Sequence, residues 1–143
     1  IRAVLDANVL VSGMLGYDRP GSKPGSLFRH IGRQTLRPVL SDWLLGEVAE
    51  TLAEPYFQRS IGVDRIGALI ALLRRHGEFC ALTVRVEGVA PDPDDDPVIS
   101  TALSADVRYL VTGDKTLRRV SEHAGVVILT PGEFLELRLF DEG

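Results

Sequence analysis

The sequence predicts an α/β domain of three layers, in which helices flank a central, mainly parallel sheet. Two observations predict this architecture. Short apolar segments with the length of strands alternate along the chain with segments of helical periodicity. The 143 residues also contain no repeat, low-complexity tract or linker, so residues 1–143 are expected to form one domain.

The first forty residues are expected to hold two strands and one short helix. Residues 1–5 are apolar apart from Arg2 and predict a buried strand, and residues 36–40 predict a second strand. Between them, the glycines and prolines of residues 12–26 indicate mostly loop. Apolar residues at helical spacing then predict a short helix around residues 27–31.

The middle of the chain is expected to hold two helices and a strand. Ser41 is a suitable N-cap for a helix whose apolar face ends before Pro55. Residues 63–76 carry apolar residues at helical spacing, and Gly77 is expected to end this second helix. Residues 79–84 are an apolar run that predicts a strand or an extended segment.

The last third of the chain alternates between helix and strand. Pro97 is expected at the first helical position of a helix that continues through Ala105. Strands are predicted at residues 109–112 and 126–129, with a helix at residues 114–120 between them. The run Thr130-Pro131-Gly132-Glu133 matches a capping box and opens the last predicted helix.

Charge and cysteine content exclude several classes of protein. The net charge of −4 argues against a protein that coats nucleic-acid duplexes, although residues 1–41 are basic overall. No apolar stretch is long enough to span a bilayer, and Asp6 and Asn8 argue against a signal sequence in residues 1–16. The lone Cys80 is expected to be a core thiol, which favours the reduced cytoplasm.

Four acidic residues follow, or lean toward, the carboxyl ends of predicted strands. Asp6 directly follows the first strand, Asp114 lies just beyond a later one, and Asp96 directly precedes a predicted helix. Glu47 lies in the second turn of its helix, and helical side chains lean toward the helix N-terminus. Because the carboxyl ends of parallel strands share one edge of the sheet, the four carboxylates are expected to meet there.

Carboxylates gathered in this way predict a site for a divalent cation. Without a cation they would repel one another, and several would have to protonate. Mg²⁺ and Mn²⁺ favour carboxylate and water oxygens as ligands. One ion, or two, could activate a water and stabilise a leaving oxygen in phosphoryl chemistry. The four charges equal the net charge of −4, so the acidity of the chain is largely that of the predicted site.

Each of these acids also has a purely structural interpretation. Asp96 and Asp114 could each do no more than cap a helix. Glu47 could be an ordinary surface acid, although it borders the apolar face of its helix, whereas Glu50 points away from that face and is excluded. Asp6 is the hardest to explain structurally, because an acid inside an apolar run needs a partner or a metal.

Other catalytic and binding motifs fail at particular positions. The acidic run at residues 92–96 resembles the start of an EF-hand loop, but Pro97 and Leu103 stand where glycine and glutamate are required. The chain contains no P-loop motif. Its three histidines lack zinc-binding spacing, and neither Ser12 nor Ser41 has the neighbours of a catalytic triad.

Four motifs together resemble the PIN domain family. They are Leu5-Asp6-Ala7-Asn8-Val9-Leu10-Val11-Ser12, Leu44-Leu45-Gly46-Glu47-Val48, Asp92-Pro93-Asp94-Asp95-Asp96 and Val111-Thr112-Gly113-Asp114-Lys115. The likeness is strongest to bacterial PIN proteins assigned as toxins of toxin–antitoxin pairs, and it extends over nearly the whole chain. It implies a central five-stranded, mainly parallel sheet and Mg²⁺- or Mn²⁺-dependent hydrolysis of RNA phosphodiesters.

The resemblance also implies site residues and partners. By motif match, the metal-binding and catalytic positions are Asp6, Glu47, Asp96 and Asp114. Asp95 competes with Asp96 for the third position, and Asp96 is favoured by its spacing from the helix that follows. Asn8 and Thr112 take the polar positions that accompany the first and last acid. The implied partners are RNA and an antitoxin protein, a second copy of the chain stays open, and no membrane is implied.

Four basic residues near the glycine-rich loop are candidates for contacts with RNA phosphates: Arg19, Lys23, Arg29 and Arg33. An ordinary solvated helix face explains them equally well. The small basic surface favours single-stranded or loop RNA over duplex. Two alternatives stay open, namely a PIN scaffold that binds protein or RNA without catalysis, and a metal-dependent phosphohydrolase that acts on small molecules.

Overall fold

The central sheet has five parallel strands and one short antiparallel strand at its edge. The computed structural model describes residues 1–140, and the strands are β1 (Arg2–Leu5), β2 (Arg37–Leu40), β3 (Glu78–Phe79), β4 (Tyr109–Val111), β5 (Glu122–His123) and β6 (Val126–Leu129). They are ordered β3-β2-β1-β4-β6-β5, and β5 pairs antiparallel with β6. The predicted mainly parallel sheet is therefore confirmed, with β5 added by a hairpin.

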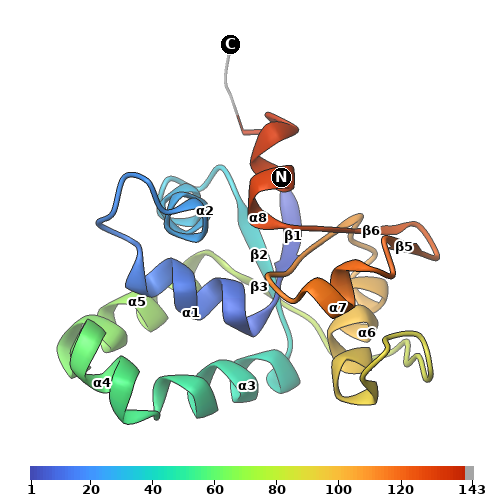
Figure 1. Cartoon of the computed structure of the whole chain (residues 1–143), viewed down its shortest axis with the longest axis horizontal. Coiled ribbons are helices and arrows are strands. Elements are labelled where there is room, and N and C mark those ends of the chain that lie inside the picture. Colours follow the sequence, from blue (N-terminus) through green and yellow to red (C-terminus); the bar gives the residue numbers. More distant parts are fainter. Residues whose placement is uncertain (141–143) are drawn as a thin grey trace.

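Helices cover both faces of this sheet (Figure 1). They are α1 (Ala7–Leu15), α2 (Lys23–Gly32), α3 (Asp42–Leu52), α4 (Pro55–Ile61), α5 (Val63–His76), α6 (Asp96–Ser104), α7 (Lys115–Arg118) and α8 (Pro131–Glu136). Helices α1, α2 and α5 lie on one side of the sheet, and α6 and α7 lie on the other. The predicted three-layer arrangement is confirmed.

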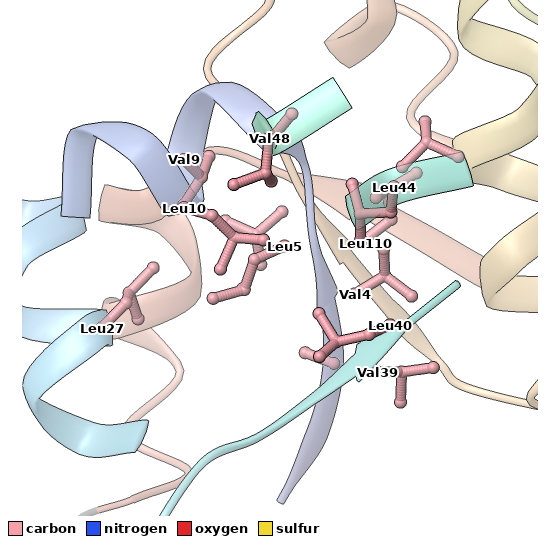
Figure 2. Close-up of a cluster of buried hydrophobic side chains, with 14 of the residues drawn as sticks. Val4, Leu5, Val9, Leu10, Leu27, Val39, Leu40, Leu44, Val48 and Leu110 are labelled. Carbon is pink, nitrogen blue, oxygen red and sulfur yellow. The ribbon is translucent and has the colours of Figure 1, made fainter. Parts of the chain in front are cut away.

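The hydrophobic core forms where the central strands meet the helices on either side. Figure 2 shows side chains from strands and helices gathered in one cluster, among them Val4, Leu10, Leu40, Leu44 and Leu110. All five are fully buried. Burying side chains of this size stabilises the fold by about 1.5–3 kcal/mol each. The core therefore holds β1 and β4 rigidly, and these two strands lead into the candidate site.

Helix α1 is the largest difference from the sequence prediction, which placed no helix at residues 7–15 and assigned loop from residue 12. Asp6 caps the helix, since its side chain accepts a hydrogen bond from the Ala7 N–H. Most of the helix is buried, so it lacks the polar face that reveals an amphipathic helix in a sequence. Further along, α1 and α2 approach closely at Gly25, where a Cβ would collide with the Gly16 carbonyl.

Smaller differences concern where elements begin and end. Pro55 does not only end α3, because it also stands in the first turn of α4, where its missing N–H has no cost. The predicted strand at residues 79–84 is reduced to Glu78–Phe79, which pairs with β2. The predicted helix at residues 114–120 is the shorter α7. Among residues 1–140, no helix combines the length and apolarity that a membrane span needs.

Candidate active site

A cleft lies at the carboxyl edge of the sheet, beyond the ends of β1 and β4. The chain moves outward from β1 to β2 and β3, then returns to the other side of β1 with β4. Open α/β sheets bind ligands at this point of reversal. The cleft has a volume of about 590 Å³, and the acidic residues of its lining are Asp6, Glu47, Glu50, Asp94, Asp95 and Asp114.

Asp6 is the most buried of these acids, with 7% of its surface exposed. Its Oδ1 accepts a hydrogen bond from the Ala7 N–H at 2.8 Å, and its Oδ2 accepts one from the Thr112 hydroxyl at 2.8 Å. Burial raises the pKa of Asp6, the two hydrogen bonds oppose that rise, and the charge of Asp114 adds to it. The fold therefore holds a carboxylate in fixed orientation where its negative charge is unfavourable.

Thr112 connects Asp6 to Asp114. While its fully buried hydroxyl donates to Asp6, its oxygen accepts a hydrogen bond from the Asp114 N–H at 3.0 Å. Asp114 is the N-cap of α7, and Asn8 Oδ1 accepts a hydrogen bond from the Gly113 N–H at 3.1 Å. The sequence-predicted residues Asp6, Asn8, Thr112 and Asp114 are thus brought together at the ends of two neighbouring strands.

Glu47 reaches the cleft from α3, as the lean of helical side chains predicts. Burial, followed by the charges of Glu50 and Asp6, raises the pKa of Glu47. Glu50, which the sequence analysis excluded, also lines the cleft. Trp43, one helical turn before Glu47, also lines the cleft. The amphipathic pattern of α3 distinguishes residues that face the core from residues on the surface. It does not show which surface residues line a cleft, so it could not identify Trp43 as a lining residue.

Asp94 and Asp95 of the acidic run both line the cleft, and Asp95 has a perturbed pKa. It is the residue before α6, and its side chain makes no capping hydrogen bond. Burial, then the charges of Asp6 and Asp114, raises the pKa of Asp95 to about 6. Three acids from distant parts of the chain therefore affect one another electrostatically across the cleft.

Asp96 does not stand where the sequence analysis expected it. The helix begins at Asp96 itself, so the cap position belongs to Asp95. The Asp96 side chain turns to a neighbouring loop, where Oδ2 accepts from the Gly88 N–H at 2.9 Å and Oδ1 accepts from the N–H groups of Val89 at 3.1 Å and Ala90 at 2.7 Å. Asp96 is 6% exposed and is not part of the cleft lining. It fastens this loop to the start of α6.

The donor set of the cleft fits a hard divalent cation. Its ionisable lining residues are carboxylates, which Mg²⁺ and Mn²⁺ favour. Within residues 1–140, no three acidic, histidine or cysteine side chains stand close enough to form a ready-made metal group. Mg²⁺ usually retains several waters and takes one or two protein carboxylates, so a cleft lined by spaced carboxylates suits this ion.

The raised pKa of Asp95 predicts that the metal-free protein is more stable at mildly acidic pH. A raised folded-state pKa contributes stability that is present below the unfolded value, here 3.8, and is lost as the pH rises through about 6. Melting temperature in EDTA is therefore expected to rise by several degrees between pH 7.5 and pH 5. Asp95→Asn should flatten this rise, whereas an identical rise in that variant would contradict the assignment.

The four basic residues proposed for RNA contact lie away from the acidic cleft, none of them being among its lining residues. Arg29 donates hydrogen bonds to the carbonyls of Tyr17 at 2.8 Å and of Gly16 at 3.4 Å, so it holds the loop between α1 and α2. Lys23 lies beside Gly132 near α8, and Arg19 lines a separate small pocket together with Arg65. Arg33 is exposed at the end of α2. Contact of these residues with RNA stays a prediction.

Because Arg29 holds a loop, its replacement is expected to affect stability before it affects binding. Arg29→Ala should lower the free energy of unfolding by about 1–2 kcal/mol, since carbonyls of the loop lose a charged donor. Arg33→Ala, on the same helix, is the matched control and should leave stability within about 0.5 kcal/mol. Urea unfolding of both variants measures the difference, and equal stabilities would show that the Arg29 contacts contribute nothing.

Comparison with known proteins agrees with the arrangement of the site. A family profile described as the PIN domain matches residues 2–116, which include every residue that lines the cleft. No curated protein sequence matches the chain. PIN domains are generally metal-dependent nucleases, and they typically bind nucleic acid. An acidic cleft at the carboxyl edge of a parallel sheet suits that chemistry. On the extent of this match and the fold that accompanies it, the chain belongs to the PIN domain family.

Proposed function

We propose that this protein is a Mg²⁺- or Mn²⁺-dependent endoribonuclease whose site residues are Asp6, Glu47, Asp95 and Asp114. One observation carries the proposal: four carboxylates from four separate segments line a single cleft in a chain of a nuclease family. Asp95 replaces Asp96 in the predicted set, because the Asp96 carboxylate is occupied by three backbone N–H groups. Asn8 and Thr112 are proposed as supporting residues.

The proposed site residues have different roles in phosphodiester hydrolysis. Asp6, Glu47, Asp95 and Asp114 would hold the divalent cation, which would supply an activated water and offset negative charge on the departing 3′ oxygen. Thr112 and the helices that they cap hold Asp6 and Asp114 in fixed orientations. Two of the proposed metal ligands are therefore preorganised. Burial and neighbouring acids raise the pKa values of Glu47 and Asp95. A bound cation would favour their ionised forms, because its charge is opposite to theirs. The products are expected to be a 5′ phosphate and a 3′ hydroxyl.

The biological role proposed for this activity is that of a toxin in a toxin–antitoxin pair. This follows the resemblance of the four acidic motifs to bacterial PIN toxins, and the proposal includes a cytoplasmic location and an antitoxin protein as partner. Expression of the chain alone in bacteria is then expected to arrest growth. Co-expression of a gene encoded immediately upstream should restore it. Growth without arrest would remove the toxin role but leave the nuclease activity open, and association with a second copy stays a prediction.

The nuclease proposal is tested by incubating purified protein with Mg²⁺, Mn²⁺ or EDTA and four substrates. These are a single-stranded RNA, the same RNA in a duplex, DNA of the same sequence, and p-nitrophenyl phosphate. Cleavage of single-stranded RNA that requires metal is the expected result. Hydrolysis of p-nitrophenyl phosphate alone would instead indicate a phosphohydrolase of small molecules. RNA binding without cleavage in any metal would indicate a scaffold.

Divalent metal is expected to raise the melting temperature of the protein. Binding to the native state alone stabilises it by about 2.7 kcal/mol at a hundredfold excess over the dissociation constant. The relief of repulsion among Asp6, Glu47 and Asp95 gives the physical reason. A thermal-shift titration with MgCl₂ and MnCl₂ at pH 7.5 measures the effect. A flat response to millimolar metal would count against the site.

A further inference from the structure

The negative charge of the cleft is expected to repel the phosphates of a nucleic acid. Its lining within the described part of the chain includes six acidic residues and no lysine or arginine. A bound cation offsets part of this charge, but the lining itself offers no positive group to the phosphates of a substrate. Apart from its contact with a bound cation, a substrate is therefore expected to gain affinity in this cleft from contacts that do not depend on attracting phosphate.

Trp43 is the one aromatic side chain among the described residues that line the cleft, and an aromatic ring offers such a contact. It lies on α3, packs partly against the hydrophobic core, and also lines the cleft. It stands four residues before Glu47, and residues at this spacing are neighbours on a helix, with Cβ atoms about 5–6 Å apart. The indole therefore lies on the same face of α3 as a proposed cation ligand.

We propose that Trp43 is a stacking platform for an unpaired nucleobase of the nucleotide next to the phosphate that is cut. This inference rests on the proposed nuclease function and specifies how the substrate is held. Every base has a flat apolar face that stacks on an aromatic ring without demanding a sequence. In a duplex both faces are covered by neighbouring bases, so the contact is available only in single-stranded or looped RNA.

Packing against the core holds the Trp43 indole within the acidic cleft. One part of the ring is buried against the core, which holds its orientation, while the remainder faces a polar space. A rigid, half-buried aromatic side chain loses little conformational freedom when it binds a ligand. Pro93 and Pro97 line the same cleft from the acidic run and restrict its backbone, so the space beside the indole is bounded by stiff segments.

The sequence contains one tryptophan, so intrinsic fluorescence reports on Trp43 alone. The protein is titrated with a short single-stranded RNA in Ca²⁺, with gels to show that the RNA remains intact. Quenching is expected with this RNA, and little quenching with the same strand in a duplex or with an oligomer of abasic residues. Equal quenching by the abasic oligomer would overturn the stacking role, because phosphate alone would then account for the change.

Variants separate base stacking from a merely structural role. Trp43→Ala is expected to weaken binding of labelled single-stranded RNA about 5- to 150-fold by anisotropy, and Trp43→Phe less than that. Binding of the abasic oligomer should be unchanged in both variants, whereas loss of structure would weaken both oligomers alike. Tyr56→Ala on α4 is the matched control, since Tyr56 is 55% exposed and is not part of the cleft lining.

The outcomes distinguish this inference from the proposed function. If wild type cuts RNA but the Trp43 variants bind and cut normal and abasic substrates as wild type does, stacking is wrong and the nuclease stands. If wild type neither cuts RNA nor shows quenching, the nuclease proposal fails and stacking falls with it. Quenching without any cleavage would support a nucleobase-binding scaffold in which Trp43 has the proposed contact.

Discussion

Asp6→Asn is expected to reduce metal-dependent RNA cleavage by at least about a hundredfold while leaving the metal-free fold intact. Asparagine has nearly the shape of aspartate but lacks the charge that binds a hard cation, and groups that stabilise developing charge contribute on this scale. The side chain still fits its surroundings. The asparagine Oδ1 can accept from the Ala7 N–H, and its amide can donate to the Thr112 oxygen if that hydroxyl rotates.

The same variant is expected to reverse the order of stabilities with and without metal. In EDTA, Asp6→Asn should melt at the same temperature as wild type or higher, since a buried charge beside other acids is removed. In Mg²⁺, wild type should be the more stable, because the variant loses much of the metal-linked stabilisation. Asp106→Asn is the matched control, because Asp106 is an exposed aspartate just beyond the C-terminal end of α6 and does not line the cleft. A variant that is less stable in EDTA and still cuts RNA would disprove the metal site.

Asp95→Asn is expected to lose activity but keep its stability, whereas Asp96→Asn is expected to lose stability but keep its response to metal. Asp95→Asn should keep a stable fold, because its side chain makes no capping hydrogen bond, and should lose cleavage and metal-dependent stabilisation. Asp96→Asn should be destabilised by about 1–3 kcal/mol, since an amide N–H₂ would face a backbone N–H of Gly88 or of Val89 and Ala90. Its metal-dependent rise in melting temperature should persist.

Three measurements on both variants distinguish the roles of these two aspartates. They are urea unfolding in EDTA, thermal shifts with Mg²⁺, and cleavage assays. Activity should be compared at a temperature at which Asp96→Asn is still folded. The reverse pattern, in which Asp96→Asn folds normally and loses metal binding while Asp95→Asn remains active, would assign the third position to Asp96 and contradict the geometry of the cleft.

Local signals in the sequence were sufficient for most of the elements around the sheet. The capping box is an example, because the Thr130 hydroxyl accepts from the Glu133 N–H at 3.2 Å and the Glu133 carboxylate accepts from the Thr130 N–H at 2.9 Å. Ser41 likewise caps α3 through the Leu44 N–H. Such signals can be recognised because the interacting groups lie within one helical turn. Helix α1 escaped detection because its burial on most sides is a property of its neighbours.

The positions of Asp6, Glu47 and Asp114 at one edge of the sheet could be predicted from the sequence, since a parallel sheet places the carboxyl ends of its strands together. The choice between Asp95 and Asp96 could not. It depends on three N–H groups of residues 88–90, where Gly88 has a positive φ of 72°, and the sequence does not reveal that this loop folds back onto α6.

The sequence by itself determined the α/β architecture, the acidic character of the site and the segments that supply it, because these follow from periodicity, capping and charge along the chain. Only the tertiary structure decided that Asp94 and Asp95, and not Asp96, line the cleft, that Glu50 and Trp43 line it too, and that Arg29 holds a loop. The physical reason is that hydrogen bonds and cleft walls are formed by groups distant in the chain. Neighbouring side chains can therefore face different surroundings, as Asp95 and Asp96 do.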